Sequence, residues 1–271
     1  MTLLTRISKR ARKTFAWIRG LWAVKVILLM HRLTGKPLRD LTVFQRRIPF
    51  IERREYSQNG EDGIIAAIFG IIGTTNCSFV EFGVEDGMEC NTRSLSKHRG
   101  WTGLLMDGNA QAPGSPVRQE FITAENIEEL FAKYGVPREF DLLSIDIDGN
   151  DYWVWKAIAH YRPRVVIIEY NACIAPEPAV TIPYDPAFRW DGTDYYGASL
   201  LALKQLGETK GYTLVCTDRN GVNAFFVWKE LAAGRFAPPP WPGTYHPAAF
   251  KGKKGNRHPA DPKRRGWMEV E

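Results

Sequence analysis

The stretch YTLVCTDRNGVNAFFVW, residues 212–228, decides which sheet fold this chain can adopt. Two apolar runs, 212–218 and 222–228, flank a short turn that contains Asn220 and Gly221. Asn-Gly between apolar runs is a strong signal for a β-hairpin, because both residues tolerate the positive φ that tight turns need. We therefore predict that the sheet ends in two antiparallel strands.

Upstream of the hairpin, short apolar runs alternate with helical patterns. The predicted strands are 78–82, 102–107, 117–122, 140–147 and 164–170. The predicted helices are 125–135, 151–161 and 197–211, and a further helix follows the polar loop that opens residues 56–75. This alternation predicts a parallel sheet with helices on both faces. The expected fold class is α/β, a Rossmann-like fold with a seven-stranded, mostly parallel sheet and a C-terminal antiparallel hairpin.

Charge and composition divide the 271 residues into three parts. Residues 1–50 open with ten Lys/Arg and no Asp/Glu up to Arg39, so the remainder has 26 basic and 30 acidic residues, a balance of about −4. Residues 51–230 form the predicted folded domain. Residues 231–271 are rich in Pro, Gly and Lys, which predicts a loosely structured tail.

The basic N-terminal part mixes Lys and Arg with aromatic residues such as Phe15, Trp17 and Trp22. This pattern is typical of a helix that lies in the plane of a membrane surface, so we expect peripheral membrane contact through residues 1–36. Its apolar run, 26–30, is far shorter than the roughly 20 residues that span a bilayer. A helix packed on the domain is the alternative, and no nucleic acid is expected because the basic excess stops here.

Four cysteines, Cys77, Cys90, Cys173 and Cys216, are scattered without a CxxC pair. This argues against a zinc site or a disulfide scaffold and suits a reducing compartment. We therefore expect a cytoplasmic location, at the inner face of the membrane if the N-terminal helix binds lipid.

The ends of the first two predicted strands carry a candidate cofactor site, since ligands of open α/β sheets bind beyond the carboxyl ends of the strands. Glu81, Gly83 and Gly87 follow the first strand with GxxxG rather than GxGxxG spacing. The acidic residues around them disfavour a pyrophosphate and suit a ligand that carries ammonium and sulfonium groups. Asp107 ends the second strand, where a carboxylate can accept hydrogen bonds from ribose hydroxyls. Ordinary turns are the alternative at both tips.

The fourth and fifth strand tips concentrate oxygen ligands. Asp146 and Asp148 share one face of the strand end, and Glu169 and Asn171 follow the next strand. We predict that Asp146, Glu169 and Asn171 hold Mg²⁺, which typically takes one or two carboxylates plus substrate oxygens and water. Asp146 and Asp148 are the candidate catalytic residues, with Asp148 as the base. A structural alternative gives Asp148 an Asx turn and makes Asp151 a helix cap.

Five segments resemble FkbM-type S-adenosylmethionine (SAM) dependent methyltransferases in their order and spacing: YSQNGEDGI, FVEFGVEDGMECNT, WTGLLMDGN, ITAENI and DLLSIDIDGND. The resemblance covers roughly residues 55–230. Five βα steps followed by a hairpin are also the layout of class I SAM methyltransferases. The resemblance implies methyl transfer from SAM to a hydroxyl of a sugar, glycan or glycolipid. It further implies SAM contacts by Gln58, Glu81, Gly83, Gly87, Asn91, Thr92 and Asp107.

The acids after the fourth and fifth strands are similar to those of metal-dependent catechol-type and macrolide-sugar O-methyltransferases. This chain departs from that pattern by one residue, Tyr170, between Glu169 and Asn171.

A long loop between the fifth strand and the helix at 197–211 holds the candidate acceptor residues. A loop of this length in a folded domain is usually functional. The candidates for sugar stacking and hydroxyl binding are Trp190, Asp191, Asp194, Tyr195 and Tyr196. Aromatic packing of a lid onto the sheet is the alternative.

Two other functions compete with the methyltransferase interpretation. A nucleotide-dependent oxidoreductase could use the same strand tips, but the missing GxGxxG and the terminal hairpin argue against it. A membrane-associated glycan-assembly component with this fold and no turnover would lack SAM binding.

Overall fold

The computed structural model describes residues 51–109, 112–236, 241–253 and 255–271. The expectations for residues 1–50, including membrane contact through 1–36, lie outside this part. In the described part of the chain, no helix has both the length and the apolar character needed to cross a membrane. The boundaries at residues 51 and 230 stay a prediction.

Seven strands form the main sheet. They are β1 (Ser78–Phe82), β2 (Thr102–Asp107), β3 (Val117–Gln119), β4 (Glu139–Ile145), β5 (Arg162–Glu169), β7 (Tyr212–Thr217) and β8 (Asn223–Trp228). Their order is β3-β2-β1-β4-β5-β8-β7. The strands from β1 to β5 pair in parallel, and β8 is antiparallel to both of its neighbours. This confirms the predicted fold class, including the C-terminal hairpin.

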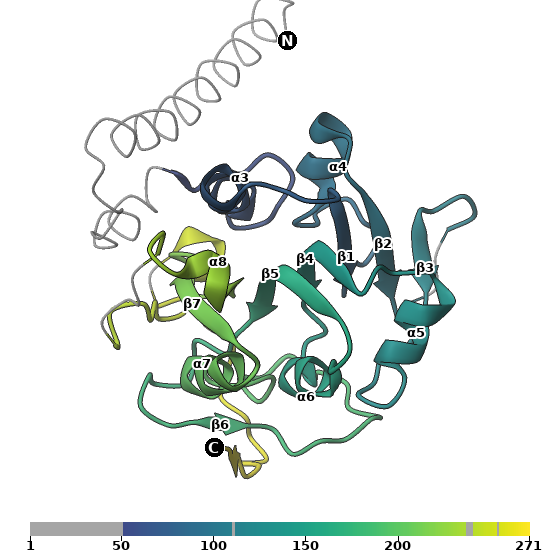
Figure 1. Cartoon of the computed structure of the whole chain (residues 1–271). Helices are drawn as coiled ribbons and strands as arrows, with labels where there is room; N and C mark the ends of the chain where they lie inside the picture. The colour runs from purple at the N-terminus through teal and green to yellow at the C-terminus, as the bar shows by residue number, and fades with distance from the viewer. Residues whose placement is uncertain (1–50, 110–111, 237–240, 254) are drawn as a thin grey trace, which may run out of the picture.

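Helices cover both faces of the sheet (Figure 1). One face holds α3 (Glu61–Ile72), α4 (Arg93–Arg99) and α8 (Lys229–Ala232). The other holds α5 (Ile127–Lys133), α6 (Asp151–Ala157) and α7 (Leu200–Thr209). The central strands β4 and β5 are therefore apolar on both sides, and polar side chains collect at their ends.

Several predicted elements are longer than the observed ones, and α6 shows why. The helix predicted for 151–161 ends at Ala157. The backbone N–H groups of Ala159 and His160 donate to Oε1 of Glu128, at 2.7 and 2.6 Å, instead of continuing the helix. The strand predicted for 117–122 likewise shortens to β3.

The C-terminal segment, defined as residues 241–271, differs from the expected loose tail. It contains a 3-10 turn, η1 (Phe250–Gly252), and a short strand, β9 (Met268–Glu269). β9 pairs antiparallel with β6 (Val180–Thr181), which lies in the loop after β5 (Figure 1). The Pro, Gly and Lys content predicted a loosely structured tail here, but hydrogen bonds such as those of Arg265 and Tyr195 hold the segment on the domain.

Candidate functional site

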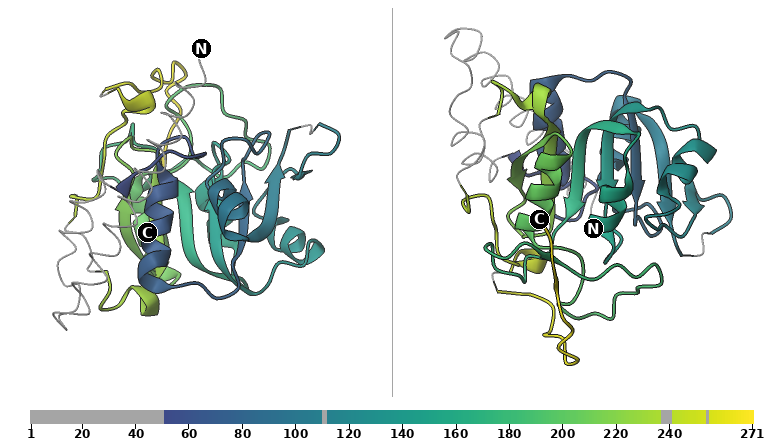
Figure 2. Two further views of the ribbon diagram at one scale, coloured as in Figure 1. Left: turned by 90° about the horizontal axis from the view of Figure 1, so that it is seen from above. Right: turned by 60° about the horizontal axis from the view of Figure 1, so that its bottom comes forward.

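A cleft of about 1380 Å³ lies over the carboxyl ends of the parallel strands. Its lining residues come from distant parts of the sequence, including the segment before α3 and the C-terminal segment. Figure 2 shows the course of these segments around the sheet. Its volume exceeds the roughly 300–1,000 Å³ that a single small ligand fills. The cleft therefore has room for a cofactor and an acceptor together.

The predicted site residues divide between the cleft wall and the structure behind it. The cleft is lined by Gln58, Glu81, Gly83, Asn91, Asp107, Asp146, Asp148, Glu169 and Trp190. The candidates outside its lining are Gly87, Thr92, Asn171, Asp191, Asp194, Tyr195 and Tyr196.

Glu81 organises the loop that follows β1. Its buried carboxylate accepts hydrogen bonds from the N–H groups of Asn91 (2.7 Å) and Thr92 (2.9 Å) and from Thr92 Oγ1 (2.6 Å). Burial raises the pKa of the Glu81 carboxyl, and the bonds from Thr92 and Asn91 act in the opposite direction. Both oxygens are engaged by the protein, so Asn91 and Thr92 hold this carboxylate in place.

The glycines of the same loop are required by the protein's own backbone. A Cβ added to Gly83 would lie 1.3 Å from the carbonyl oxygen of Asp146, and the φ of Gly83 is +75°. A Cβ on Gly87 would lie 3.1 Å from Cγ2 of Val117, again at positive φ. Gly83 thus lets the loops after β1 and β4 cross at the floor of the cleft.

Asp107 connects the loops after β1 and β2. Its Oδ2 accepts from the N–H of Glu85 at 2.7 Å, and its Oδ1 accepts from the N–H of Asn109 at 2.7 Å. Each carboxylate oxygen has two lone pairs, so each keeps one for a ligand. The position fits a ribose whose hydroxyls donate to this carboxylate.

Three carboxylates meet at the ends of β4 and β5. Ile145 pairs with Ile168, so Asp146 and Glu169 leave adjacent strands side by side. One oxygen from each of Asp146, Asp148 and Glu169 lies within 4.8 Å of the others, and we call this group the carboxylate cluster. Glu169 Oε2 is buried without a hydrogen-bond partner.

The electrostatics of the carboxylate cluster favour a bound proton or cation. Desolvation by burial, followed by the neighbouring carboxylates, raises the pKa of Asp146 and of Glu169 well above the usual range. Asp148 is open to the cleft yet has protein on most sides. Desolvation and the charge of Asp151 raise its pKa to about 6.

Asp151, rather than Asp148, stabilises the turn between β4 and α6. Its carboxylate accepts from the N–H groups of Ile147 and Gly149, both at 2.9 Å. Asp148 adopts a left-handed backbone conformation with a φ of 55°, which Asp tolerates. The structural role is thus filled by Asp151, and the side chains of Asp146 and Asp148 remain available at the cleft.

Asn171 was predicted to be a Mg²⁺ ligand, but it does not line the cleft. Its Nδ2 donates to the carbonyl oxygens of Asp194 and Tyr196, both at 2.8 Å, and its Oδ1 accepts from the N–H of Cys173. The side chain anchors the loop after β5, and Asp148 takes its place beside Asp146 and Glu169. Three hard carboxylate oxygens at this separation suit Mg²⁺.

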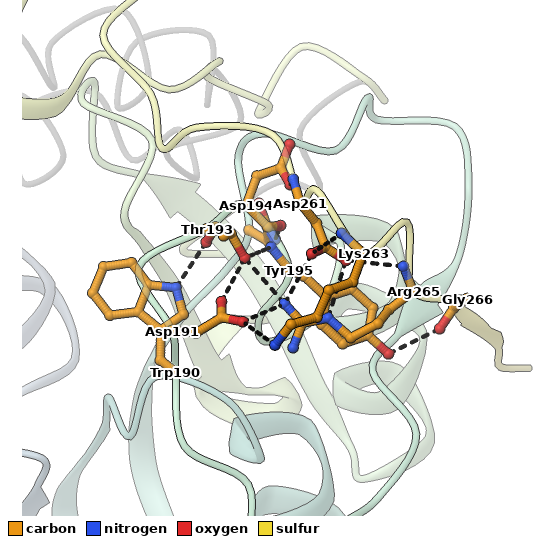
Figure 3. Close-up of polar contacts among 10 residues, drawn as sticks. Trp190, Asp191, Thr193, Asp194, Tyr195, Asp261, Lys263, Arg265 and Gly266 are labelled. Carbon is orange, nitrogen blue, oxygen red and sulfur yellow. Dashed lines mark hydrogen bonds and ion pairs between the residues drawn. The ribbon is translucent and has the colours of Figure 1, made fainter.

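The acceptor candidates on the long loop are mostly bonded to the C-terminal segment. Asp191 pairs with Lys263 (3.3 Å) and Arg265 (2.8 Å), and Tyr195 Oη donates to the carbonyl of Gly266 (Figure 3). Tyr196 is buried behind the cleft wall. Asp194 bonds to the same segment, because its Oδ1 accepts from the N–H of Asp261 at 2.8 Å. Asp191, Asp194 and Tyr195 therefore support the loop rather than contact a sugar directly, and Trp190 alone of the five candidates lines the cleft.

Sequence reasoning missed three aromatic residues at the acceptor end of the cleft: Phe188, Phe250 and His258. Phe188 lies in the long loop after β5, which was already predicted to hold acceptor residues. Phe250 and His258 come from the Pro-, Gly- and Lys-rich C-terminal segment, where no periodic pattern singles them out.

No protein-family model matches the chain, and no curated protein matches it. The chain is similar to the solved 1,6-didemethyltoxoflavin-N1-methyltransferase of Burkholderia thailandensis, which holds 1,6-didemethyltoxoflavin and S-adenosylhomocysteine. The identity is 13%, the TM-score is 0.40, and the match covers 76% of this chain and 87% of that one. A SAM-dependent methyltransferase from Aquifex aeolicus is similar at 10% identity and a TM-score of 0.30, over 68% of this chain and 97% of the other. At these scores the fold assignment rests on the strand order itself.

Proposed function

We propose that this chain is a SAM-dependent methyltransferase that acts on a hydroxyl of a sugar, glycan or glycolipid, with Mg²⁺ held by the carboxylate cluster. The observation that carries the proposal is one cleft with two differently built halves. Ordered loops around Asp107 lie in one half, and the unpaired acids Asp146, Asp148 and Glu169 lie in the other.

The half of the cleft around Asp107 fits SAM by its charge and shape. Two ribose hydroxyls can donate to the free lone pairs of Asp107. The acidic side chains Glu85 and Asp86 line the same half and suit the positive charges of the amino group and the sulfonium. When bound, SAM supplies an activated methyl group on a sulfur atom that leaves as a neutral thioether.

The half around the carboxylate cluster fits an acceptor hydroxyl. A hydroxyl is a poor nucleophile at neutral pH, and a carboxylate near it can take its proton. Without a bound ion, desolvation and the charge of Asp151 raise the pKa of Asp148 to about 6. A carboxylate oxygen of Asp148 that does not hold the ion can act as the general base. The acceptor oxygen would take the methyl group that SAM supplies, with the thioether as the leaving group, and Asp148 would accept the hydroxyl proton.

The metal proposal rests on the donor set alone. Asp146, Asp148 and Glu169 would hold the ion, which supplies a positive charge that orients the acceptor oxygen and lowers its pKa. Asp146 and Glu169 need such a charge, because burial of unpaired carboxylates is unfavourable.

Calorimetric titration tests this proposal. The wild-type protein is titrated with SAM, S-adenosylhomocysteine and NADH, each with and without Mg²⁺. We expect micromolar binding of SAM and its product but not of NADH, and loss of that binding in Asp107→Ala. Asp146→Ala should abolish turnover and keep most of the SAM affinity. Absence of SAM binding under both conditions would remove the methyltransferase proposal, and full activity of Asp146→Ala would remove the metal role.

A further inference from the structure

We propose that the C-terminal segment completes the acceptor site, by supplying His258 as one wall and by fixing Trp190 as another. We further infer that this site takes a neutral sugar ring and rejects an anionic one. Both statements rest on the proposed function and specify the substrate class of the same cleft.

The loop that carries Trp190 is anchored beside the carboxylate cluster at both ends. Asn150, which follows β4, donates from Nδ2 to the carbonyl of Asp185 at 2.8 Å. Asn171, which follows β5, donates to the carbonyls of Asp194 and Tyr196. The residues between these anchors therefore lie over the tips of the two strands that supply the cluster.

Phe188 confirms this placement through a close packing contact. A Cβ added to Gly149 would lie 2.4 Å from Cδ1 of Phe188, so the ring packs directly on the backbone next to Asp148. Phe188, Trp190 and Asp148 all line the cleft. An acceptor that contacts Trp190 is thus within reach of the carboxylate cluster.

The C-terminal segment fixes the orientation of Trp190 through Arg265 (Figure 3). Trp190 Nε1 donates to the carbonyl of Thr193 at 2.7 Å, and Thr193 Oγ1 donates to Asp191 at 2.6 Å. Arg265 Nη2 donates to both Asp191 (2.8 Å) and Thr193 Oγ1 (3.2 Å), and its Nε donates to Asp261 (3.0 Å). Arg265 is therefore a positioning residue, because it orders the turn that holds the indole.

His258 forms the second wall. Its ring centroid lies 4.6 Å from that of Trp190, 5.6 Å from that of Tyr196 and 4.6 Å from that of Phe250. Burial lowers the pKa of His258, so the imidazole is neutral at physiological pH and can exchange hydrogen bonds with a hydroxyl. Rings with an apolar body and a polar edge suit a sugar, which presents C–H groups on its face and hydroxyls at its rim.

The charge of the cleft sets the class of sugar. Eleven acidic side chains and three arginines line it in the described part of the chain. Arg54 pairs with Glu89, Arg219 pairs with Glu52, and Arg189 stacks 3.8 Å over the ring of Phe121. The acids outnumber the arginines in this lining, and the three carboxylates of the cluster exceed the two positive charges of a bound Mg²⁺. A carboxylate or phosphate on the entering ring therefore meets net repulsion.

Saturation-transfer NMR on the protein loaded with S-adenosylhomocysteine and Mg²⁺ tests the inference. The probes are methyl glycosides of neutral hexoses and 6-deoxyhexoses, each hexoside paired with its uronate, which differs only by a carboxylate in place of the CH₂OH group. We expect saturation of the ring protons of at least one neutral glycoside and binding at least about tenfold weaker for its uronate.

Variants separate the two walls from general stability. His258→Ala and Arg265→Ala should each weaken the neutral glycoside by about tenfold, with S-adenosylhomocysteine affinity within about twofold of wild type. Arg265→Lys should restore part of the affinity. Lys263→Ala is the matched control, because Lys263 also pairs with Asp191 but has no bond to Thr193. If His258→Ala does not fold, His258→Phe replaces it, because Phe keeps an aromatic ring and removes the hydrogen-bonding nitrogens.

Three results would overturn the inference while the proposed function stands, each with S-adenosylhomocysteine still bound. They are no saturation of any neutral glycoside, equal binding of a glycoside and its uronate, and unchanged glycoside binding in both His258→Ala and Arg265→Ala. Loss of S-adenosylhomocysteine binding in the wild type is the separate result that would reject the proposed function.

Discussion

The two ends of the β4–β5 pair carry acidic residues in opposite circumstances, with Asp141 buried at one end and Asp146 and Glu169 half-buried at the other. At the amino end, Asp141 lies beside Arg164 and bonds to its Nη1 at 2.7 Å. Asp141 also accepts from the N–H groups of residues 75–77. At the carboxyl end, Asp146 lies beside Glu169, and both neighbours are acids.

This difference distinguishes acids that stabilise the fold through protein partners from acids that have no such partner and can bind a ligand. A buried charge is tolerated when it is paired and hydrogen-bonded, as Asp141 is. Asp146 and Glu169 have no cationic partner among the described residues, so the fold keeps them at a cost that an external proton or cation relieves. The same contrast divides the cleft, since Glu81 and Asp107 are engaged by backbone N–H groups and the carboxylate cluster is not.

The largest loss of stability should come from removing Asp141, whose carboxylate is fully paired at the amino end of the strands. Asp141→Ala removes the acceptor of the bonds from residues 75–77 and leaves Arg164 without its partner. We expect a loss of about 3–5 kcal/mol in the free energy of unfolding, measured by urea denaturation. Asp141→Asn, which keeps one acceptor oxygen, should lose less. A loss below about 1 kcal/mol for Asp141→Ala would show that the hydrogen bonds and ion pair of Asp141 contribute little to stability.

At the other end, added Mg²⁺ or Mn²⁺ should stabilise the protein. A free ion at 100 times its Kd raises the free energy of unfolding by about 2.7 kcal/mol. Desolvation and the charge of Asp151 raise the pKa of Asp148 to about 6, and the pKa values of Asp146 and Glu169 are also raised well above the usual range. Protons therefore compete with the ion, and the stabilisation should be full near pH 8 and fade as the pH falls through 6.

In the metal-free protein, the contribution of these three carboxyl groups to stability should change with pH in the opposite direction. A carboxyl whose pKa is raised on folding keeps its proton in the folded state, so its contribution to stability is present at low pH and is lost as the pH rises through the folded value. Urea denaturation at pH 5 and pH 8, with and without Mg²⁺, measures both trends. Equal stabilisation by Mg²⁺ at the two pH values would contradict binding at the carboxylate cluster.

The strands of the sheet and the side chains at the strand ends could be predicted from the sequence. Apolar runs predict buried strands, and the Asn220-Gly221 turn predicts the hairpin, because both signals are local. Strand ends of a parallel sheet meet at one edge, so the proximity of Asp146 and Glu169 also follows from local pattern and topology.

The sequence could not show which acids are satisfied. The donors to Glu81 come from a loop ten residues away, and the donors to Asp141 come from a loop more than sixty residues away. The same holds for the C-terminal segment, whose attachment depends on individual bonds from Arg265 and Tyr195 rather than on periodic apolar residues. Bonds of this kind depend on exact tertiary placement and leave no repeating signal.

The same substitution, Glu to Gln, should have opposite effects in the two halves of the cleft. In the half around Asp107, Glu81 uses both oxygens to accept three bonds. Gln offers one accepting oxygen and one donating NH₂ group, so Glu81→Gln leaves a buried donor unsatisfied. We expect a loss of about 1–3 kcal/mol in unfolding free energy and weaker SAM binding. Glu85→Gln, on the exposed part of the same loop, is the control for stability, and a loss of unfolding free energy of equal size there would reject this explanation.

In the half around the carboxylate cluster, Glu169→Gln should stabilise the metal-free protein. The change removes one of two adjacent half-buried acids, and the Gln NH₂ group can donate to Asp146, so repulsion is replaced by a hydrogen bond. A gain of roughly 1 kcal/mol is expected near pH 8, where the repulsion is strongest, with little gain at pH 5. The variant should also lose stabilisation by Mg²⁺, because one of the three ligand oxygens no longer carries charge. Glu177→Gln, exposed in the following loop, should change neither quantity. If Glu169→Gln instead destabilises the metal-free protein as Glu81→Gln does, then Glu169 has a structural partner and the contrast between the two halves fails.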